Sequence, residues 1–249
     1  MTLSVLVTGG AGYIGSTLVP LLLEAGHRVT VVDRFYFGQE SLAEAIGRFG
    51  DRLRLVRADV RRLDASVFKG IDAVVDLAGI SNDPSCEIDT ELTRAVNLNG
   101  SLNTMQKAHE AGVKRFVFAS SCSVYGRGED TGLCETSKLR PVSLYAKCKA
   151  EAEQGLFALQ GKGMCVTALR FATVFGLSRR MRFDLAVNVM TKNAYTQGRI
   201  TVDGGGKQWR PFVHVLDVGE TVTGVLMANT ENVDGQVFNV GSEAANVRI

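Results

Sequence analysis

The chain has few of the residues that build metal sites and disulfide frameworks. Among its 249 residues there are three histidines, far apart, and five cysteines, an odd number without a C-x-x-C pair. Zinc sites need closely spaced ligands, and disulfide frameworks need cysteines that can pair. The composition therefore predicts reduced thiols in a cytoplasmic protein that holds no metal.

The chain also lacks an excess of charge of one sign and any long apolar run. Its formal net charge is +2, and the basic residues are scattered apart from a short run at 179–182. That is too little for a nucleic-acid footprint, so the run indicates a small anionic ligand or a solvated face. No apolar run approaches the length of a membrane span, and no cationic segment followed by a long apolar region opens the chain. We expect neither a membrane span nor a signal peptide.

Apolar strands alternate with helices along the first part of the chain. Helical periodicity marks 13–25, 90–111 and 143–159, and β-rich apolar runs lie at 3–8, 28–33, 53–58, 73–77, 114–120 and 164–169. Near-continuous apolar strands separated by helices are typical of a parallel sheet that is covered on both faces. The pattern predicts an α/β fold with a doubly wound parallel sheet.

The alternation loosens after about residue 175. We expect a nucleotide-binding domain over 1–175 and a smaller substrate-binding lobe over 176–249. Two short apolar runs, near 212–214 and 237–240, are predicted to return to the main domain as strands.

A glycine-rich loop lies between the first predicted strand and the first predicted helix. Gly9 permits a tight turn, Gly12 lets the backbone approach a pyrophosphate, and Gly15 allows the helix to pack closely on the strand. The backbone at Tyr13 and Ile14 opens the helix, where free N–H groups and the helix dipole favour phosphates. The loop predicts a dinucleotide site of the Rossmann type.

An acidic residue ends the second predicted strand, 18 residues after Gly15. The Asp33 carboxylate at that place accepts hydrogen bonds from ribose hydroxyls and repels a 2′-phosphate, which favours NAD over NADP. Arg34 is the counter-argument, because an arginine there is able to meet that phosphate. Asp59, followed by Val60, comes after the third strand, where it can meet the adenine edge or cap a helix; both interpretations stay open.

A tyrosine and a lysine lie one helical turn apart, at positions 145 and 149. Residues at i and i+4 share one face of a helix, so the Lys149 ammonium lies near the Tyr145 phenol. A neighbouring cation favours the phenolate, and we therefore expect the pKa of Tyr145 to be lowered. Such a tyrosine is a usable acid and base near neutral pH.

Six segments together resemble the extended short-chain dehydrogenase/reductase superfamily, and within it the nucleotide-sugar epimerases and dehydratases such as UDP-glucose 4-epimerase. The likeness covers essentially the whole chain, and the six segments occur in the family's order. They are the loop Thr8–Gly15, Leu77-Ala78-Gly79, Asn97-x-x-Gly100, the strand end Ser120–Gly126, Tyr145-x-x-x-Lys149, and Arg210–Asp217.

The resemblance implies a role for each matching residue. Ser121 would hydrogen-bond the reacting sugar oxygen, with Ser123 as the alternative. Tyr145 would be the general base, and Lys149 would bind the nicotinamide ribose and hold the tyrosine ionised. Further residues would contact the two ligands: Leu77, Ala78, Gly79, Asn97, Ser120, Phe171 and Val174 the cofactor, and Thr173, Asn188 and Arg210 the substrate.

Two departures from the family pattern bear on the reaction. Family dehydratases carry an Asp-Glu pair directly after the catalytic hydroxyl, and the related decarboxylases keep the glutamate, whereas this chain has Cys122 and Ser123. Neither residue is a carboxyl acid or base, which argues against loss of water and against glutamate-assisted decarboxylation. Family members also continue well beyond Ser242, so we expect a substrate lobe truncated at Ile249.

The resulting hypothesis is an NAD-dependent epimerase of a nucleotide-diphosphate sugar, acting at C4 through transient hydride transfer and a keto-sugar. The alternatives are an NAD(P)-dependent keto-sugar reductase or dehydrogenase of the same superfamily, and a non-catalytic nucleotide-binding regulatory protein. The resemblance further implies a homodimer that joins through the helices at 90–111 and 143–159.

Overall fold

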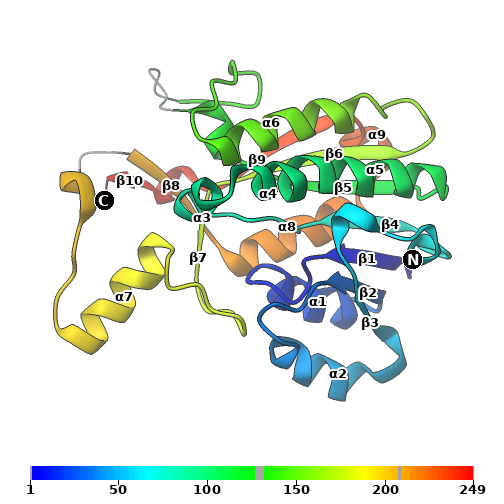
Figure 1. The fold of residues 1–249 in the computed structure, drawn as a ribbon, viewed down its shortest axis with the longest axis horizontal. Helices are drawn as coiled ribbons and strands as arrows, with labels where there is room; N and C mark the ends of the chain where they lie inside the picture. Colours follow the sequence, from blue (N-terminus) through cyan, green and yellow to red (C-terminus); the bar gives the residue numbers. More distant parts are fainter. Residues whose placement is uncertain (1, 127–131, 207–208, 249) are drawn as a thin grey trace.

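The centre of the molecule is a seven-stranded parallel sheet (Figure 1). The computed structural model describes residues 2–126, 132–206 and 209–248. The sheet has the order β3-β2-β1-β4-β5-β6-β9, which confirms the predicted α/β doubly wound class. Its strands are β1 (Ser4–Thr8), β2 (Arg28–Asp33), β3 (Leu53–Arg57), β4 (Ala73–Asp76), β5 (Arg115–Ser121), β6 (Cys165–Phe171) and β9 (Gln236–Val240).

The strand order reverses between β1 and β4. The chain moves outward from β1 to β2 and β3, then returns to the other side of β1 for β4, β5 and β6. β1 and β4 are in register at their carboxyl ends, where Thr8 pairs with Asp76. In open α/β sheets ligands bind at the carboxyl ends of the strands beside such a reversal, so the fold fixes where the site must lie.

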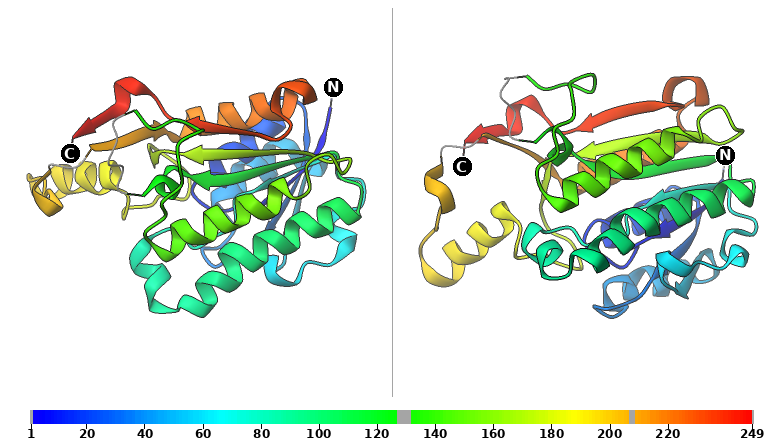
Figure 2. Two further views of the ribbon diagram at one scale, coloured as in Figure 1. Left: turned by 90° about the horizontal axis from the view of Figure 1, so that it is seen from above. Right: turned by 45° about the horizontal axis from the view of Figure 1, so that its top comes forward.

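One face of the sheet is covered by α1 (Gly15–Glu24), α2 (Ala43–Phe49) and α8 (Val215–Met227). The views in Figure 2 show α1 and α8 on the same side, away from α5 and α6. Their apolar stripes and the inward residues of the strands form one core, including Leu18, Leu22, Val31, Val75 and Val222. Both faces of the sheet are thus buried, which explains its near-continuous apolar strands.

The other face is covered by α4 (Thr90–Arg94), α5 (Ser101–Glu110) and α6 (Leu144–Phe157), with α3 (Asp83–Ile88) beside them (Figure 2). The helix predicted over 90–111 has a π-helical turn at Ala95–Gly100 in its middle. Such turns admit one extra residue and re-aim the side chains around them. The homodimer that the resemblance links to these helices stays a prediction.

A smaller lobe lies beyond the carboxyl ends of the strands (Figures 1 and 2). It contains β7 (Thr173–Phe175), β8 (Trp209–His214), β10 (Asn246–Arg248) and α7 (Ala186–Gln197), while α9 (Thr230–Val233) precedes β9. Of the two runs expected to return to the main domain, 237–240 joins the seven-stranded sheet as part of β9, whereas 212–214 lies in β8, which pairs with β7 and β10 in a separate three-stranded sheet. The division at residue 175 stays a prediction, and Ile249, on which the expected truncation rests, lies outside the described residues.

Helices long and apolar enough to cross a membrane do not occur in the described ranges. The longest helix of the described ranges, α6, covers the sheet and carries charged residues along its length.

A buried ion pair joins α6 to β6. Arg170 donates to both carboxylate oxygens of Glu153, at 3.0 and 2.7 Å, and the two side chains are 5% and 4% exposed. The Ser120 hydroxyl donates to the same carboxylate at 2.5 Å. Arg170 also donates to the Tyr125 hydroxyl, which donates to the Asn239 side chain on β9. These contacts fasten α6 to three neighbouring strands.

We expect Arg170→Met to lower the free energy of unfolding by about 3–5 kcal/mol, since it leaves the Glu153 charge buried without its partner. Urea unfolding followed by circular dichroism measures the change. The matched control is Arg94→Met, which breaks an exposed 3.0 Å pair with Glu151 on the same helix. That control should cost about 1 kcal/mol or less, and equal effects of the two substitutions would contradict the assignment.

Candidate active site

The glycine loop is packed so tightly that a Cβ at Gly15 would overlap its backbone and one at Gly9 or Gly12 would be crowded. A Cβ on Gly15 would lie 2.5 Å from the Gly9 carbonyl oxygen, and one on Gly9, whose φ is +65°, would lie 3.0 Å from the Ala78 backbone. Gly12 donates from its N–H to the Gly9 carbonyl at 3.0 Å, and its own Cβ would lie 3.1 Å from that oxygen. The loop thus leaves bare backbone before α1, as a pyrophosphate site requires. Tyr13 and Ile14 immediately precede the helix.

The Asp33 carboxylate lies at the end of β2, beside the glycine loop. It accepts hydrogen bonds from the Ala11 N–H at 3.1 Å and from the Phe35 N–H at 2.8 Å. These bonds fix the orientation of the carboxylate toward the carboxyl edge of the sheet. The arrangement fits the role of a ribose-binding acid.

Arg34 and Asp59 are paired with each other across this edge at 3.0 Å. Asp59 also accepts from the Arg61 backbone N–H and side chain, and so caps the single turn of 3₁₀ helix at Val60–Arg62. The hydrogen bond from the Arg61 side chain lowers the pKa of Asp59 to about 2. Of the two interpretations left open, the structure shows the helix cap, and an adenine contact stays a prediction.

The segment after β4 crosses the glycine loop. Leu77 and Ala78 donate from their N–H groups to the Thr8 hydroxyl, each at 3.1 Å. The buried Asn97 side chain accepts from the Ile80 N–H at 2.7 Å and donates to the Ile80 carbonyl at 2.8 Å. Asn97 therefore holds the segment in place from the π-helical turn, and its direct contact with a cofactor stays a prediction.

The other residues expected beside the cofactor lie around the same edge. Val60 is buried near Gly100, whose Cβ would come within 2.8 Å of it. Phe171 ends β6 in the core, and Val174 packs against that core from β7. Ser120 is buried and engaged with Glu153.

Ser121, Tyr145 and Lys149 meet where β5 ends and α6 begins. The Ser121 hydroxyl lies close enough to the Tyr145 phenol to favour its charged form. The Lys149 Nζ lies 5.9 Å from the centroid of the Tyr145 ring and donates to the Ala119 carbonyl at 2.7 Å. Ser143 caps α6 by accepting from the Ala146 N–H, which sets Tyr145 in the first helical turn. The predicted serine, tyrosine and lysine are thus brought together.

The prediction that the pKa of Tyr145 is lowered is wrong for the protein without bound ligands, in which this pKa is raised. Burial of the phenol raises its pKa to about 12, and attraction by Arg182 and the hydrogen bond with Ser121 oppose this rise. The reason is that the spacing of 145 and 149 fixes which face they share but says nothing of desolvation, which disfavours the phenolate.

The expected substrate residues lie between the main sheet and the smaller lobe. Asn188 is buried at the start of α7, where it donates to the Tyr13 hydroxyl at 3.1 Å and accepts from the Gly176 N–H at 3.1 Å. Its amide thus binds the glycine loop to the lobe. Thr173 lies on β7 and the exposed Arg210 lies on the adjacent β8. Their contacts with a substrate stay predictions.

These features are accompanied by matches to known proteins. A family model described as the NAD dependent epimerase/dehydratase family matches residues 5–241. The chain belongs to this family. The resemblance seen in the sequence is confirmed, and the cofactor predicted from the glycine loop and Asp33 is NAD.

The proteins that resemble the chain are named for different reactions. It is 33% identical to a UDP-N-acetyl-alpha-D-glucosaminuronate decarboxylase of Bacillus cytotoxicus, over 96% of this chain and 74% of the relative. A structure of MoeE5 in complex with UDP-glucuronic acid and NAD matches with a TM-score of 0.82 and 32% identity, over 96% of this chain and 76% of that chain. The UDP-glucuronic acid 4-epimerase from Bacillus cereus matches with a TM-score of 0.87 and 25% identity, over 96% and 78%.

Sequence reasoning missed Arg182 as a residue of the site. It donates to the Ser81 hydroxyl at 2.6 Å and pairs with Asp184, and its side chain is 17% exposed. Among the groups that lower the pKa of Tyr145, Arg182 has the largest effect. The sequence feature that could have pointed to Arg182 is the basic run at 179–182, which indicated either a small anionic ligand or a solvated face.

The two positions after Ser121 contain no strong acid or base. The Cys122 thiol donates to the Arg170 carbonyl at 3.2 Å, and burial raises its pKa to about 11. The Ser123 hydroxyl oxygen is buried and has no hydrogen-bond partner among the described residues. Groups of three or more potential metal ligands are also absent from the described part of the chain.

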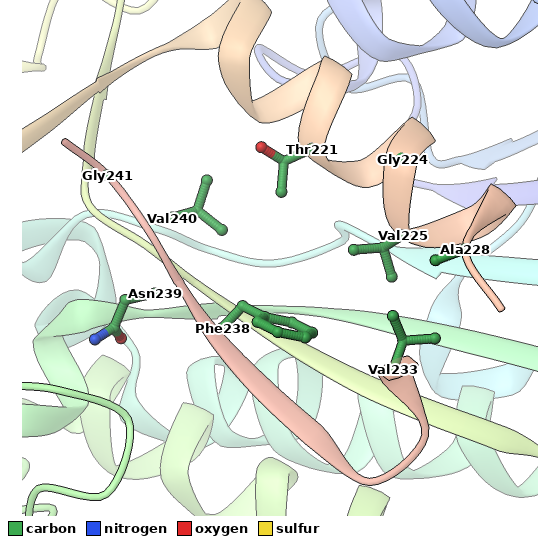
Figure 3. Close-up of a pocket in the computed structure, with 9 residues that line it drawn as sticks. All are labelled: Thr221, Gly224, Val225, Ala228, Val233, Phe238, Asn239, Val240 and Gly241. Carbon is green, nitrogen blue, oxygen red and sulfur yellow. The ribbon is translucent and has the colours of Figure 1, made fainter. Parts of the chain in front are cut away.

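An apolar hollow lies elsewhere, between α8 and β9 (Figure 3). Phe238 and Val240 point from β9 toward α8, whereas the Asn239 side chain points the other way, toward Tyr125. None of the predicted site residues lines the hollow, so the site is defined by the strand ends and not by this cavity.

We expect Gly15→Ala to weaken NAD binding and to destabilise the protein, because the added methyl group overlaps the Gly9 carbonyl. Overpacking of this kind costs about 1–3 kcal/mol of free energy, which we expect to be divided between weaker NAD binding and lower stability of the fold. Titration calorimetry with NAD and thermal unfolding measure them. Gly47→Ala is the control, since a Cβ there meets nothing within 4 Å; unchanged NAD affinity in Gly15→Ala would contradict the packing argument.

We expect Arg182→Met to raise the pKa of Tyr145, since it removes a cation that favours the phenolate. A base with a higher pKa loses its proton at higher pH, so the acid limb of the kcat/KM profile should move up by about 0.5–1 pH unit. Arg179→Met, which breaks an exposed pair with Glu44, is the control and should leave the profile in place. A downward move in Arg182→Met would refute the assignment.

Proposed function

We propose that the protein is an NAD-dependent epimerase of a nucleotide-diphosphate sugar, acting at C4. The observation that carries the proposal is the meeting of Ser121, Tyr145 and Lys149 at the end of β5 and the start of α6, with Cys122 and Ser123 after Ser121 in place of acids. Such a site can move a proton to and from one sugar hydroxyl. It has no carboxyl group at positions 122 and 123 to serve as the acid or base of an elimination.

The residues that would hold NAD are those of the glycine cradle and Asp33. Bare backbone at Gly9–Gly15 would accommodate the pyrophosphate, and the Asp33 carboxylate, held by the Ala11 N–H, would accept from ribose hydroxyls. Bound there, NAD would supply the acceptor, and once reduced the donor, of the hydride at the sugar carbon. The reaction then leaves no net change in the redox state.

The side chains of Tyr145 and Ser121 would transfer the proton of the sugar hydroxyl. Tyr145 takes the proton of the sugar hydroxyl as the carbonyl forms and gives it back after the keto-sugar has turned over. Ser121 shares this hydrogen bond and fixes the direction of the phenol. Because burial raises the pKa of Tyr145 to about 12, nearby positive charge is needed to make the phenolate accessible. Arg182 opposes the rise, and the Lys149 ammonium lies 5.9 Å from the centroid of the ring.

The second candidate is decarboxylation of a nucleotide uronic acid, favoured by the relative named as a decarboxylase. Arg182 beside Tyr145 gives this candidate a cation for a sugar carboxylate. The chemistry at 122 and 123 favours epimerisation instead. Both candidates begin with the same oxidation at C4. They differ afterwards, because epimerisation returns the hydride to the other face of C4, whereas decarboxylation breaks the C5–C6 bond, releases CO₂ and protonates C5.

The test is incubation with UDP-glucose and UDP-glucuronic acid in D₂O, followed by NMR of the sugar. An epimerase returns the same hydrogen to C4, so we expect the C4 epimer without deuterium at C4 or C5 and without net NADH. Decarboxylation yields a pentose and CO₂ with deuterium at C5, and dehydration a deoxy keto-sugar. Either product would overturn the proposal, as would stoichiometric consumption of added NADH or NADPH by a keto-sugar.

Tyr145→Phe should reduce kcat by at least about 10²-fold, because the proton acceptor is removed. Ser121→Ala should reduce it less, since the tyrosine remains. The control is Tyr195→Phe on the exposed surface of α7, where the side chain is 92% exposed. Full activity of Tyr145→Phe would remove the assigned base.

A further inference from the structure

A buried carboxyl group lies beneath the proposed site and has no role in it so far. Asp76 ends β4, one of the two central strands beside the reversal of strand order. Its side chain is 1% exposed. Buried aspartates are rare unless they are paired, so this carboxyl group needs a partner.

The sheet register directs Asp76 toward Lys149. Asp76 on β4 is in register with Thr8 on β1 and with Phe118 on β5. Residues in register on neighbouring parallel strands point to the same face and stand about 4.8 Å apart. That face is the one covered by α5 and α6, because Phe118 belongs to the core beneath them. The Lys149 Nζ lies 4.6 Å from the centroid of the Phe118 ring, above the same row.

The hydrogen bonds leave one side of the carboxyl group available. The Thr8 hydroxyl donates to Asp76 Oδ1 at 2.5 Å, while it accepts from two backbone N–H groups. Asp76 Oδ2 and the Ser101 hydroxyl oxygen are buried without a well-formed hydrogen bond in the described part of the chain. Burial raises the pKa of the Asp76 carboxyl group, and the Thr8 hydroxyl, Lys149 and the Ser101 hydroxyl oppose this rise by favouring its charged form.

The other titratable groups around Lys149 do not take the place of Asp76. Burial disfavours the charged form of Lys149, and attraction by Asp76 is the largest effect that opposes it. Glu153 also acts on the ammonium, but Arg170 already pairs with its carboxylate. Burial raises the pKa of the Cys86 and Cys148 thiols, so both are neutral near pH 7. Tyr145 is neutral in the protein on its own.

We propose that Asp76 is a positioning residue for the reaction: it is the interior counter-ion that holds the Lys149 side chain charged and in place beneath Tyr145. The proposal rests on the role given to Lys149 above. Asp76 acts on the phenol indirectly. Its carboxylate stabilises the charged form of Lys149 on α6, and that ammonium in turn stabilises the phenolate of Tyr145, one helical turn away.

The arrangement has a consequence of definite sign. Loss of the Asp76 charge lowers the pKa of Lys149, since burial then acts without opposition from this partner. A less charged Lys149 no longer favours the phenolate, so the pKa of Tyr145 rises. A carboxylate that acted directly on Tyr145 would have the opposite effect, because its removal would lower the pKa of the phenol.

The first experiment measures Lys149 itself and does not depend on any activity. Protein labelled with ¹³C-lysine is titrated by NMR, and the Lys149 signal is assigned from its absence in Lys149→Met. In Asp76→Asn, which keeps an acceptor for the Thr8 hydroxyl, the Lys149 midpoint should fall by ~1 pH unit or more. An unchanged or raised midpoint overturns the proposal.

The matched control is Asp72→Asn, at an exposed aspartate that accepts from the Ser4 N–H just before β4. It should leave the Lys149 midpoint unchanged. If Asp76→Asn does not fold, the reciprocal measurement replaces it: in Lys149→Met, the ¹³Cγ signal of Asp76 should titrate at higher pH than in the parent protein. An Asp76 midpoint that does not move overturns the proposal equally.

The second experiment separates the positioning role from a merely structural one. The acid limb of the kcat/KM profile should move to higher pH in Asp76→Asn, and the same substitution in a Lys149→Met background should produce no further move. A uniform loss of rate at every pH would show a structural role only. If no sugar is turned over at all, the proposed function fails, while the NMR titration still decides the role of Asp76.

Discussion

The structure depends on the close crossing of two segments at the centre of the sheet: the glycine loop after β1 and the segment after β4. The Thr8 hydroxyl accepts from Leu77 and Ala78 and donates to Asp76, so one side chain joins both segments. Gly9 permits the approach because a Cβ there would meet the Ala78 backbone. The glycine loop and the floor of the proposed catalytic site are therefore held by the same contact.

Periodicity and local chemistry predicted the features that a short stretch of chain determines. The strands, the glycine loop, Asp33 and the helical spacing of Tyr145 and Lys149 all follow from patterns of a few residues. Three features depend on distant parts of the chain and could not be predicted. They are the raised pKa of Tyr145, which burial causes; the pairing of β8 with β7; and the approach of Arg182 to the phenol.

The site combines an apolar setting with charges that come from separate elements. Lys149 comes from α6, Arg182 from the segment before α7, and Asp76 from β4. A phenol in such a setting is neutral until cations are brought beside it, so its reactivity depends on how those elements are assembled. This explains why Cys122 and Ser123, although adjacent to Ser121, add little to the acid–base chemistry: burial keeps the thiol protonated.

The chain of side chains from Glu153 through Arg170 and Tyr125 to Asn239 has a consequence for local motion. β9 is the last strand of the sheet, and edge strands usually open more readily than central ones. Here the edge is tied by polar contacts to the helix that carries Tyr145 and Lys149. We therefore expect the edge strand and α6 to form one cooperative unit, so that fraying of β9 would loosen the helix that holds Tyr145 and Lys149.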